Sequence, residues 1–322
     1  MADTARSPER NFPSLLRRVP GVAAIMVALI IVFALLSPKF LTLSNLYNIS
    51  LQSSVLLIIA LPMTILIMTE GLDLSMGAVL ALGTVVLALV LVATGSITLA
   101  LAVAIFVGLC FGIFNGVLIA YAGIPPFVVT LGSLGMAQGL ALVLSDGQSI
   151  VGISEAVQQL YSGTLLAVPI PIWIGAAIYA VFHILLYHTR FGNYIFAAGG
   201  NPEALKIAGV SYERLLVAAY TIAGATVGLA SLLMTARMNS GHPTAALGME
   251  FDAIAAVAVG GTSFERGNSW LLGTLLGVLT IGILRNGLNL LATPSSLQVA
   301  SIGLLVIVAL FVDNLSKSGR AS

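Results

Sequence analysis

Two carboxylates and a hydroxyl in one short run, Glu70, Asp73 and Ser75, are the residues best placed to do chemistry in this chain. They interrupt a long apolar sequence, because neither residues 40–69 nor residues 74–145 contain any Asp, Glu, Lys or Arg. Ionisable groups at membrane depth are functional candidates by default. Asp73 would alternatively cap the helix that follows it, and Glu70 would gain from the positive end of that helix. The run therefore indicates either a capped turn near a membrane face or part of a pore or gate.

A second acidic pair, Glu250 and Asp252, is a looser echo of that run later in the chain. A further similarity favours an internal repeat: the G-I-F-N-G-V sequence around Asn115 resembles G-I-L-R-N-G-L at residues 282–288, with one residue inserted. The offset between the two copies spans five predicted membrane elements, and an odd number gives the copies opposite orientations. The sequence therefore predicts two inverted five-helix repeats, and Asn115, Glu250 and Asp252 join the candidates for translocation or gating.

The elements that position these residues are predicted to be membrane helices. Only 8% of the 322 residues are charged and 59% are hydrophobic, whereas a soluble domain carries about 25% charged residues. A run of about 20 apolar residues can cross a bilayer as a helix. We therefore predict an all-α polytopic membrane protein with about ten transmembrane helices, at residues 19–36, 46–68, 74–94, 97–121, 125–144, 165–187, 215–235, 252–261, 270–291 and 297–312. The eighth is too short to cross about 30 Å alone and is predicted to be partial or re-entrant.

The distribution of basic residues predicts how these spans are oriented. With a cytoplasmic N-terminus, the cytoplasmic side holds all of the thirteen basic residues except Lys39, Arg237 and Arg285. The turn at Glu265 and Arg266 is then cytoplasmic as well. The predicted organisation is a cytoplasmic N-terminal tail at 1–18, a first membrane half at 19–187, a cytoplasmic loop at 188–214, a second membrane half at 215–312 and a cytoplasmic C-terminal tail at 313–322.

The loop between the two halves contains the clearest signals for a short helix. A turn signal that ends at Pro202 leads into a predicted helix at 203–208, which Gly209 terminates. Asn201 would be its N-cap, Pro202 occupies the favoured first position, and Glu203 complements the positive helix end. A short capped helix between long apolar stretches is a feature that a partner protein could bind.

Several functional classes find no support in the sequence. The net charge of +1 gives no electrostatic basis for binding nucleic acid. Nothing has metal-ligand spacing, a nucleophile–base pattern or the pattern of a P-loop, so we expect no catalytic site, no metal and no nucleotide site. Any ATP would be bound by another chain. The single Cys110 sits in an apolar, glycine-rich run and is expected to be a small residue of the packed core.

Two ladders of glycines at helical spacing predict close helix packing. Gly108, Gly112 and Gly116 form the first ladder, and Gly273 and Gly277 form the second. Glycine removes side-chain bulk, so helix backbones can approach each other closely within a membrane bundle.

Four stretches, in order along the chain, together resemble the sugar-transport permeases of the ribose/xylose/arabinose family of ATP-binding-cassette (ABC) importers. Residues 70–83 (EGLDLSMGAVLALG) resemble that family's GGIDLSVGSVLAL run. Residues 126–134 (PFVVTLGSL) and 139–142 (GLAL) resemble its PFIVTLGTL and GLAL. Residues 199–209 (GGNPEALKIAG) resemble GGNPEAARLAGI, and residues 255–263 (AAVAVGGTS) resemble AAVVLGGTS.

The resemblance implies a permease of ten helices, related in architecture to the cobalamin importer, in the cytoplasmic (inner) membrane of a bacterium. Such a permease works as a homodimer or close heterodimer. Two cytoplasmic ATPase subunits, which bind ATP and magnesium, and a periplasmic sugar-binding protein complete the importer. One segment matches the family's coupling helix, which rests in a groove of the ATPase. Its candidate coupling residues are Gly200, Asn201, Pro202, Glu203, Ala204, Lys206 and Gly209.

The implied function is the permease subunit of an importer for a monosaccharide or a related small polyol. Two departures from the family pattern are Glu70, where glycine is more usual, and residues 264–266, which replace a small glycine-rich run. An ion-coupled secondary transporter of a small polar solute is the alternative, because inverted repeats suit both classes. That alternative needs ionisable residues at the bilayer midplane, and residues 40–69 and 74–145 have none.

Overall fold

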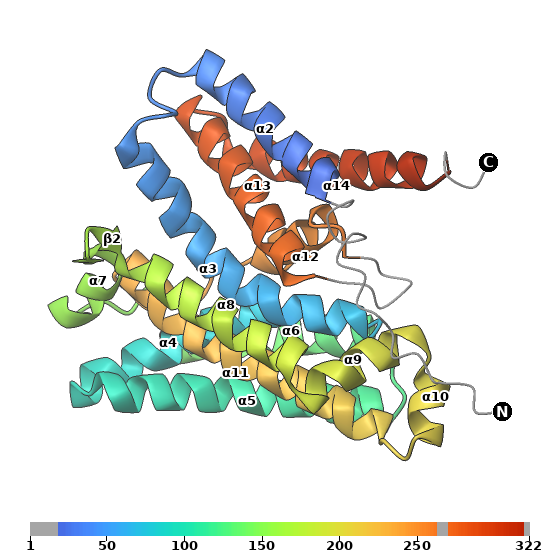
Figure 1. Cartoon of the computed structure of the whole chain (residues 1–322). Coiled ribbons are helices and arrows are strands. Elements are labelled where there is room, and N and C mark those ends of the chain that lie inside the picture. The colour runs from blue at the N-terminus through green and yellow to red at the C-terminus, as the bar shows by residue number, and fades with distance from the viewer. Residues whose placement is uncertain (1–18, 263–269, 319–322) are drawn as a thin grey trace.

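The computed structural model describes residues 19–262 and 270–318, which form a helical bundle with one short hairpin (Figure 1). The predicted tail at 1–18, the predicted turn at Glu265 and Arg266 and the last residues 319–322 lie outside the described residues. The elements are α2 (Val19–Leu36), α3 (Leu43–Met68), α4 (Met76–Thr94), α5 (Ile97–Ala120), α6 (Pro126–Ser145), α7 (Glu155–Ser162), β1 (Thr164–Leu165), β2 (Val168–Pro169), α8 (Ile170–His188), α9 (Arg190–Gly200), α10 (Pro202–Ile207), α11 (Tyr212–Met238), α12 (Met249–Val259), α13 (Leu271–Leu290) and α14 (Ser295–Ser318).

The fold is an all-α polytopic membrane protein, as predicted. Within the described ranges, seven helices are long and apolar enough to cross a membrane, namely α3, α4, α5, α6, α8, α11 and α13. Two more have shorter apolar segments, Gly21–Leu36 in α2 and Ser295–Val308 in α14. The predicted short eighth element corresponds to α12, which has 11 residues.

Capping side chains explain why two helices begin earlier than predicted. The Thr42 side chain accepts a hydrogen bond from the Asn45 amide at 3.4 Å, so α3 begins at Leu43. The Ser211 hydroxyl accepts from the Arg214 amide at 3.2 Å, so α11 begins at Tyr212. Such a cap satisfies an amide that has no partner inside its own helix.

Two segments have a different regular structure from the one predicted. Most of the segment 188–214 is helical, because α9 and α10 occupy it. A hairpin of β1 and β2 takes the residues predicted to start the sixth span, so that span begins at Ile170. Leu166 and Ala167 form the turn with φ of 54° and 62°. This left-handed conformation normally favours glycine or asparagine, and because neither residue is present at the turn, no hairpin was predicted.

Both predicted glycine ladders are confirmed as close helix contacts inside the bundle. A Cβ atom at Gly108 would overlap the Gly224 carbonyl of α11, and one at Gly224 would overlap the Gly108 carbonyl. In the same way a Cβ at Gly277 of α13 would overlap the Ala256 carbonyl of α12. The α5–α11 and α12–α13 contacts are therefore backbone against backbone, with no room for a larger residue.

The expectation for Cys110 was wrong, because its side chain is exposed. At 100° per residue, position 110 lies on the face of α5 opposite Gly108 and Gly112, which pack against α11. The glycine-rich run around Cys110 thus reflects packing on one face of the helix only.

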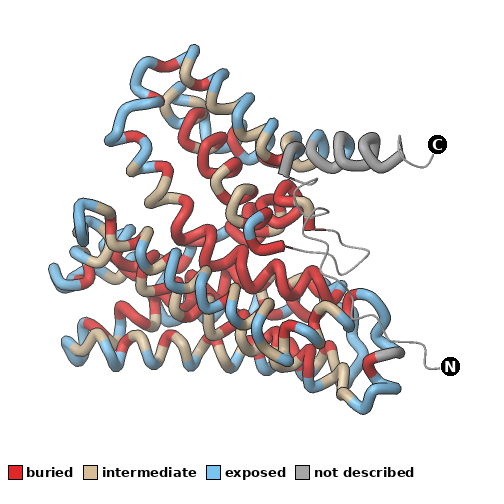
Figure 2. Tube along the Cα trace, in the orientation of Figure 1, coloured by how far each residue is buried: buried red, intermediate tan, exposed pale blue. Residues whose placement is uncertain are grey.

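The bundle has a buried centre and two distinct ends. Helix α3 passes through the middle and is buried along most of its length, whereas α5, α6 and α8 expose apolar side chains (Figure 2). Helices α9 and α10 lie at one end of the molecule, and α7 and the hairpin lie at the other (Figure 1). The position of each polar residue can therefore be described relative to these two ends.

Candidate functional site

The acidic turn between α3 and α4 lies at the α9–α10 end of the bundle. Tyr212, the first residue of α11, donates from its hydroxyl to the Thr69 carbonyl at 3.4 Å, next to this turn. Glu70 is exposed and has a φ of 59°, so it occupies a conformation that glycine adopts at less cost. This explains the glycine that is more usual at this position in the family pattern.

Asp73 accepts a hydrogen bond from the Ser75 amide, as predicted, but the N-cap residue of α4 is Ser75 and not Asp73. The Asp73 Oδ1 atom accepts from the Ser75 amide at 2.9 Å and from the Ser75 hydroxyl at 2.5 Å. Asp73 lies between two spans and is only 3% exposed. Burial raises the pKa of this carboxyl, and the hydrogen bonds from Ser75 oppose that rise.

The hydrogen bonds of Asp73 continue into two further helices. Asn115 on α5 donates from Nδ2 to the Ser75 hydroxyl at 3.1 Å, and the Ser133 hydroxyl on α6 donates to Asn115 Oδ1. All four side chains are buried. We call Asp73, Ser75, Asn115 and Ser133 the first-half cluster, because it joins the start of α4 to α5 and α6 within the first membrane half.

The second acidic pair, Glu250 and Asp252, lies in the first turn of α12. Asp252 Oδ2 is 2.6 Å from Arg285 Nη2 on α13, and we call these two residues the second-half pair. Asp252 is 6% exposed, and 37% of the Arg285 side chain is exposed. The sequence reasoning did not list Arg285 as a candidate, although it is the sole charged residue in the sequence from 267 to 312.

Glu250 connects the two halves of the molecule. Its Oε1 accepts from the Gly248 amide at 3.3 Å, and its buried Oε2 has no hydrogen-bond partner among the described residues. A Cβ atom at Gly77, in the first turn of α4, would overlap this Oε2. The start of α12 therefore packs against the start of α4, the helix that follows Asp73 in the chain.

Asn286, beside Arg285, is the counterpart of Asn115 in the predicted repeat. Its Nδ2 donates to Asn45 Oδ1 at 2.9 Å, and Asn45 Nδ2 donates back to Asn286 Oδ1 at 2.8 Å. Asn45 is in the first turn of α3, and Tyr47, two residues later, donates to the Ala167 carbonyl of the hairpin. This polar contact thus lies toward the hairpin end, opposite to the first-half cluster.

The predicted short helix is present as α10, at the far end from the hairpin. Asn201 Oδ1 accepts from the Glu203 amide at 3.0 Å, which confirms its capping role, and Gly209 ends the helix with a φ of 77°. The turn was predicted from Gly199, but Gly199 and Gly200 are the last two residues of α9, so the turn starts two residues later, at Asn201. The side chain of Ala204 lies outside what the structure describes.

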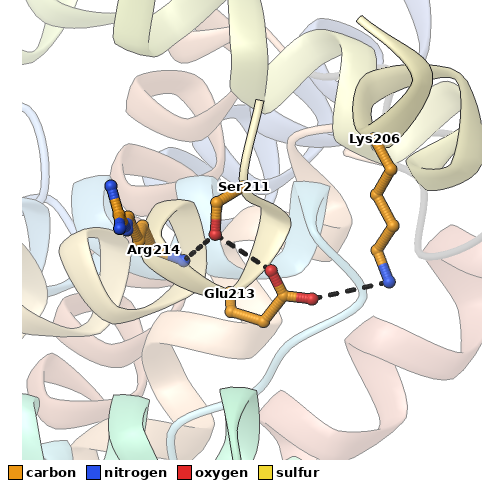
Figure 3. Close-up of polar contacts among 4 residues, drawn as sticks. All are labelled: Lys206, Ser211, Glu213 and Arg214. Atoms are coloured by element: carbon orange, nitrogen blue, oxygen red, sulfur yellow. Dashed lines mark hydrogen bonds and ion pairs between the residues drawn. The ribbon is translucent and has the colours of Figure 1, made fainter. Parts of the chain in front are cut away.

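A polar network joins α10 to the start of α11 (Figure 3). Lys206 Nζ is 3.5 Å from Glu213 Oε1, and the Ser211 hydroxyl donates to Glu213 Oε2 at 2.9 Å. Leu205 is buried beneath α10, whereas Ile207 is 88% exposed. Helix α10 is therefore anchored on one side and presents Glu203, Lys206 and an apolar side chain on the other.

The site residues thus form three separate groups: the first-half cluster, the start of α12 with the second-half pair, and α10. Among the described residues, no group of three or more His, Cys, Asp and Glu could hold a metal ion. The buried groups bond mainly to each other and across helices. The arrangement therefore joins helices to one another and offers no metal-binding group among the described residues.

These features define a helical membrane protein whose buried polar residues connect helices across the bundle. Comparison with known families gives the assignment: the chain belongs to the family described as "Branched-chain amino acid transport system / permease component", whose model matches residues 45–310. The resemblance inferred from the four sequence stretches is thereby confirmed.

Characterised relatives cover nearly the whole chain. Ribose import permease protein RbsC of Escherichia coli (strain K12) is 37% identical over 294 residues, which is 90% of this chain and 91% of that protein. D-allose transport system permease protein AlsC of the same strain is 33% identical over 92% of this chain and 91% of its own length. L-arabinose ABC transporter permease protein AraH of Azospirillum brasilense is 31% identical over 99% of this chain and 94% of its own. No solved structure matches the chain.

Proposed function

We propose that the chain is the transmembrane permease subunit of an ABC importer that moves a monosaccharide or a related small polyol across the bacterial inner membrane. The relatives named for ribose, allose and arabinose support this substrate class. ATP and magnesium would be bound by two separate ATPase subunits, and a periplasmic sugar-binding protein would deliver the substrate. This chain would act as a transport subunit with no nucleotide site of its own, paired with a second permease subunit.

The proposed topology has ten membrane helices in two inverted five-helix repeats, related in architecture to the cobalamin importer. The first repeat would comprise α2 to α6, and the second would comprise α8, which precedes the loop at 188–214, together with α11, α12, α13 and α14. The third and fourth elements of each repeat support the symmetry. Asp73 and Asn115 meet at the α9–α10 end, whereas Asp252 and Arg285 meet toward the other end. The α9–α10 end, with both chain termini, would then be cytoplasmic.

The observation that carries the proposal is the surface of α10. It presents Glu203, the charged end of Lys206 and the apolar Ile207 at one end of the bundle, which is the mixture of groups that a protein partner can bind. We propose that α10 fits a groove in the ATPase. The direction of the chain before and after this helix would be set by Gly200, Asn201, Pro202 and Gly209. Ala204 belongs to the same segment.

Movement of α10 would reach the membrane helices through direct contacts. Lys206 and Glu213 connect α10 to the start of α11, and the Val210 amide donates to the Leu205 carbonyl at 3.2 Å. Helix α11 in turn packs against α5 through Gly224 and Gly108. When ATP draws the two ATPases together, the coupling helices would follow, and the bundles would rock between outward-open and inward-open states. Glu70, Asp73, Ser75, Asn115, Glu250 and Asp252 remain the proposed gating residues.

The Glu203→Lys variant tests the coupling role. Glu203 is exposed, so reversal of its charge should change the contact with the ATPase and leave the fold intact. We expect at least a tenfold loss of sugar uptake in cells, with normal amounts of permease in the membrane. Glu155→Lys, an exposed carboxylate at the opposite end, is the matched control and should transport normally. Normal uptake by Glu203→Lys, with unchanged association of the ATPase, would contradict the coupling role.

Two measurements on the wild-type protein test the transport class and the substrate. The purified permease should retain an ATPase, and vanadate should block uptake; persistence of uptake in vanadate would instead favour ion coupling. Binding of pentoses, hexoses and polyols to the cognate periplasmic protein would identify the substrate. If that protein binds none of them, the proposed substrate class is wrong.

A further inference from the structure

Arg285 occupies an unusual position for a charged residue in a membrane helix. The Leu271 amide, at the start of α13, donates a hydrogen bond to the Tyr187 hydroxyl at 3.1 Å, close to the end of α8 that leads into α9. Arg285 lies about 20 Å further along α13, at about 1.5 Å per residue. Since the hydrocarbon core is about 30 Å thick, the guanidinium lies within the depth of the membrane.

The guanidinium is fixed in this position by its partner. Asp252 is buried and holds Arg285 Nη2 at 2.6 Å. The Nε atom of Arg285 is buried too, and it has no hydrogen-bond partner among residues 19–262 and 270–318. Long basic side chains in membrane helices normally extend toward the interface. The pairing with Asp252 prevents this, so the charge stays at its present depth.

The exposed side of Arg285 therefore needs a polar environment. Its side chain is 37% exposed, and exposure of a charged group to hydrocarbon is strongly unfavourable. A guanidinium has five N–H donors, and the pair with Asp252 uses only part of them. Water in a passage through the protein, or the hydroxyl oxygens of a polyol, can accept hydrogen bonds from the remaining donors.

We infer that Arg285, oriented by Asp252, lines the aqueous translocation passage and donates hydrogen bonds to the hydroxyl groups of the sugar in transit. This inference rests on the proposed function in sugar import. Asp252 acts as a positioning residue, because it holds the guanidinium while its own carboxylate stays buried. The neighbouring Asn286–Asn45 contact fixes this part of α13 against α3, so Arg285 projects from a rigid segment.

Cysteine accessibility tests the passage directly, because Cys110 is the single natural cysteine. In a Cys110→Ser background, Arg285→Cys is treated with a charged, membrane-impermeant methanethiosulfonate in spheroplasts that contain the whole importer. We expect at least tenfold faster labelling than for Ile184→Cys, whose side chain is 55% exposed on the outer face of α8. The Asp252→Asn/Arg285→Cys double variant avoids an unpaired buried carboxylate and should label equally fast. If the Asp252→Asn/Arg285→Cys variant is labelled as slowly as Ile184→Cys, the proposal that Arg285 lines an aqueous passage is wrong.

Sugar protection and conservative replacement test the contact with substrate. Saturating sugar with its binding protein should slow labelling of Arg285→Cys at least threefold. The Arg285→Lys variant, which keeps Asp252, should retain more of the uptake rate than the Asp252→Asn/Arg285→Gln double variant. The two variants are compared at equal amounts of permease in the membrane. If sugar leaves the labelling rate of Arg285→Cys unchanged and the two replacement variants take up sugar at equal rates, the proposed contact between Arg285 and the sugar is wrong. Uptake by the wild type tests the proposed function separately, because it does not depend on Arg285.

Discussion

In the proposed inverted repeat, the first-half cluster and the second-half pair occupy equivalent places, but they differ in chemistry. Asp73 meets the neutral groups Ser75, Asn115 and Ser133, and all of them are buried. Asp252 meets a full positive charge whose side chain is 37% exposed. A buried cluster whose members hydrogen-bond to one another serves to hold helices together. A charge that remains partly exposed at membrane depth is available to a solute. The comparison therefore separates a cluster that couples helices, as a gate requires, from a residue that can contact the solute.

The largest expected effect comes from removing the positive charge of the second-half pair. Arg285→Ala leaves the buried Asp252 carboxylate without a partner, so we expect the free energy of unfolding to fall by about 3 kcal/mol. Thermal unfolding of the purified permease, followed by circular dichroism, measures this loss. Asp252→Asn/Arg285→Ala should recover much of it, since no unpaired charge remains. Equal instability of the single and double variants would show that Arg285 acts through its packing.

A smaller effect is expected from the centre of the first-half cluster. Asn115→Ala removes two buried side-chain hydrogen bonds, and the free energy of unfolding should fall by about 2 kcal/mol. Asn193→Ala, on the exposed surface of α9, should change it little. In the cysteine experiment, Asn115→Cys should stay unlabelled by the impermeant reagent. Labelling as fast as at position 285 would remove the distinction between the two regions.

The smallest effect is expected at Glu70, beside the first-half cluster. Its φ of 59° is unfavourable for any residue with a Cβ atom, so Glu70→Gly should raise the free energy of unfolding by about 0.5 kcal/mol. Glu70→Ala removes the same charge but keeps the Cβ, and it should bring no gain. The same unfolding measurement compares the two variants. A gain from alanine as large as that from glycine would assign the effect to charge.

The sequence predicted the helices well where the signal was a long apolar run, and less well where polar contacts decide the structure. The α3, α5 and α13 spans differ from their predicted bounds by only a few residues. Helix α9 was missed because its glycines and polar residues favour a loop, although one face packs against the bundle through buried Ile195 and Ala198. Packing from distant parts of the chain supplies the stability that local propensity lacks.

The candidate site was predictable to different extents in its three groups. The hydrogen bond from the Ser75 amide to Asp73 joins neighbours in sequence, so a local pattern sufficed to predict it. The capped helix at Asn201 was found for the same reason. Arg285 was missed because its partner Asp252 lies on another helix, and the one-residue insertion in the repeat directed attention to Asn286 instead. The isolation of Arg285 in an uncharged sequence was the available signal.

The close contact between α5 and α11 has a mechanical consequence. Because their backbones touch at Gly108 and Gly224, neither helix can slide or tilt much without displacing the other. Helix α11 has 27 residues, so it is about 40 Å long. In the proposed mechanism the two helices would move as one rigid body. A displacement of α10 would therefore reach the far face of the membrane without being absorbed by bending of either helix.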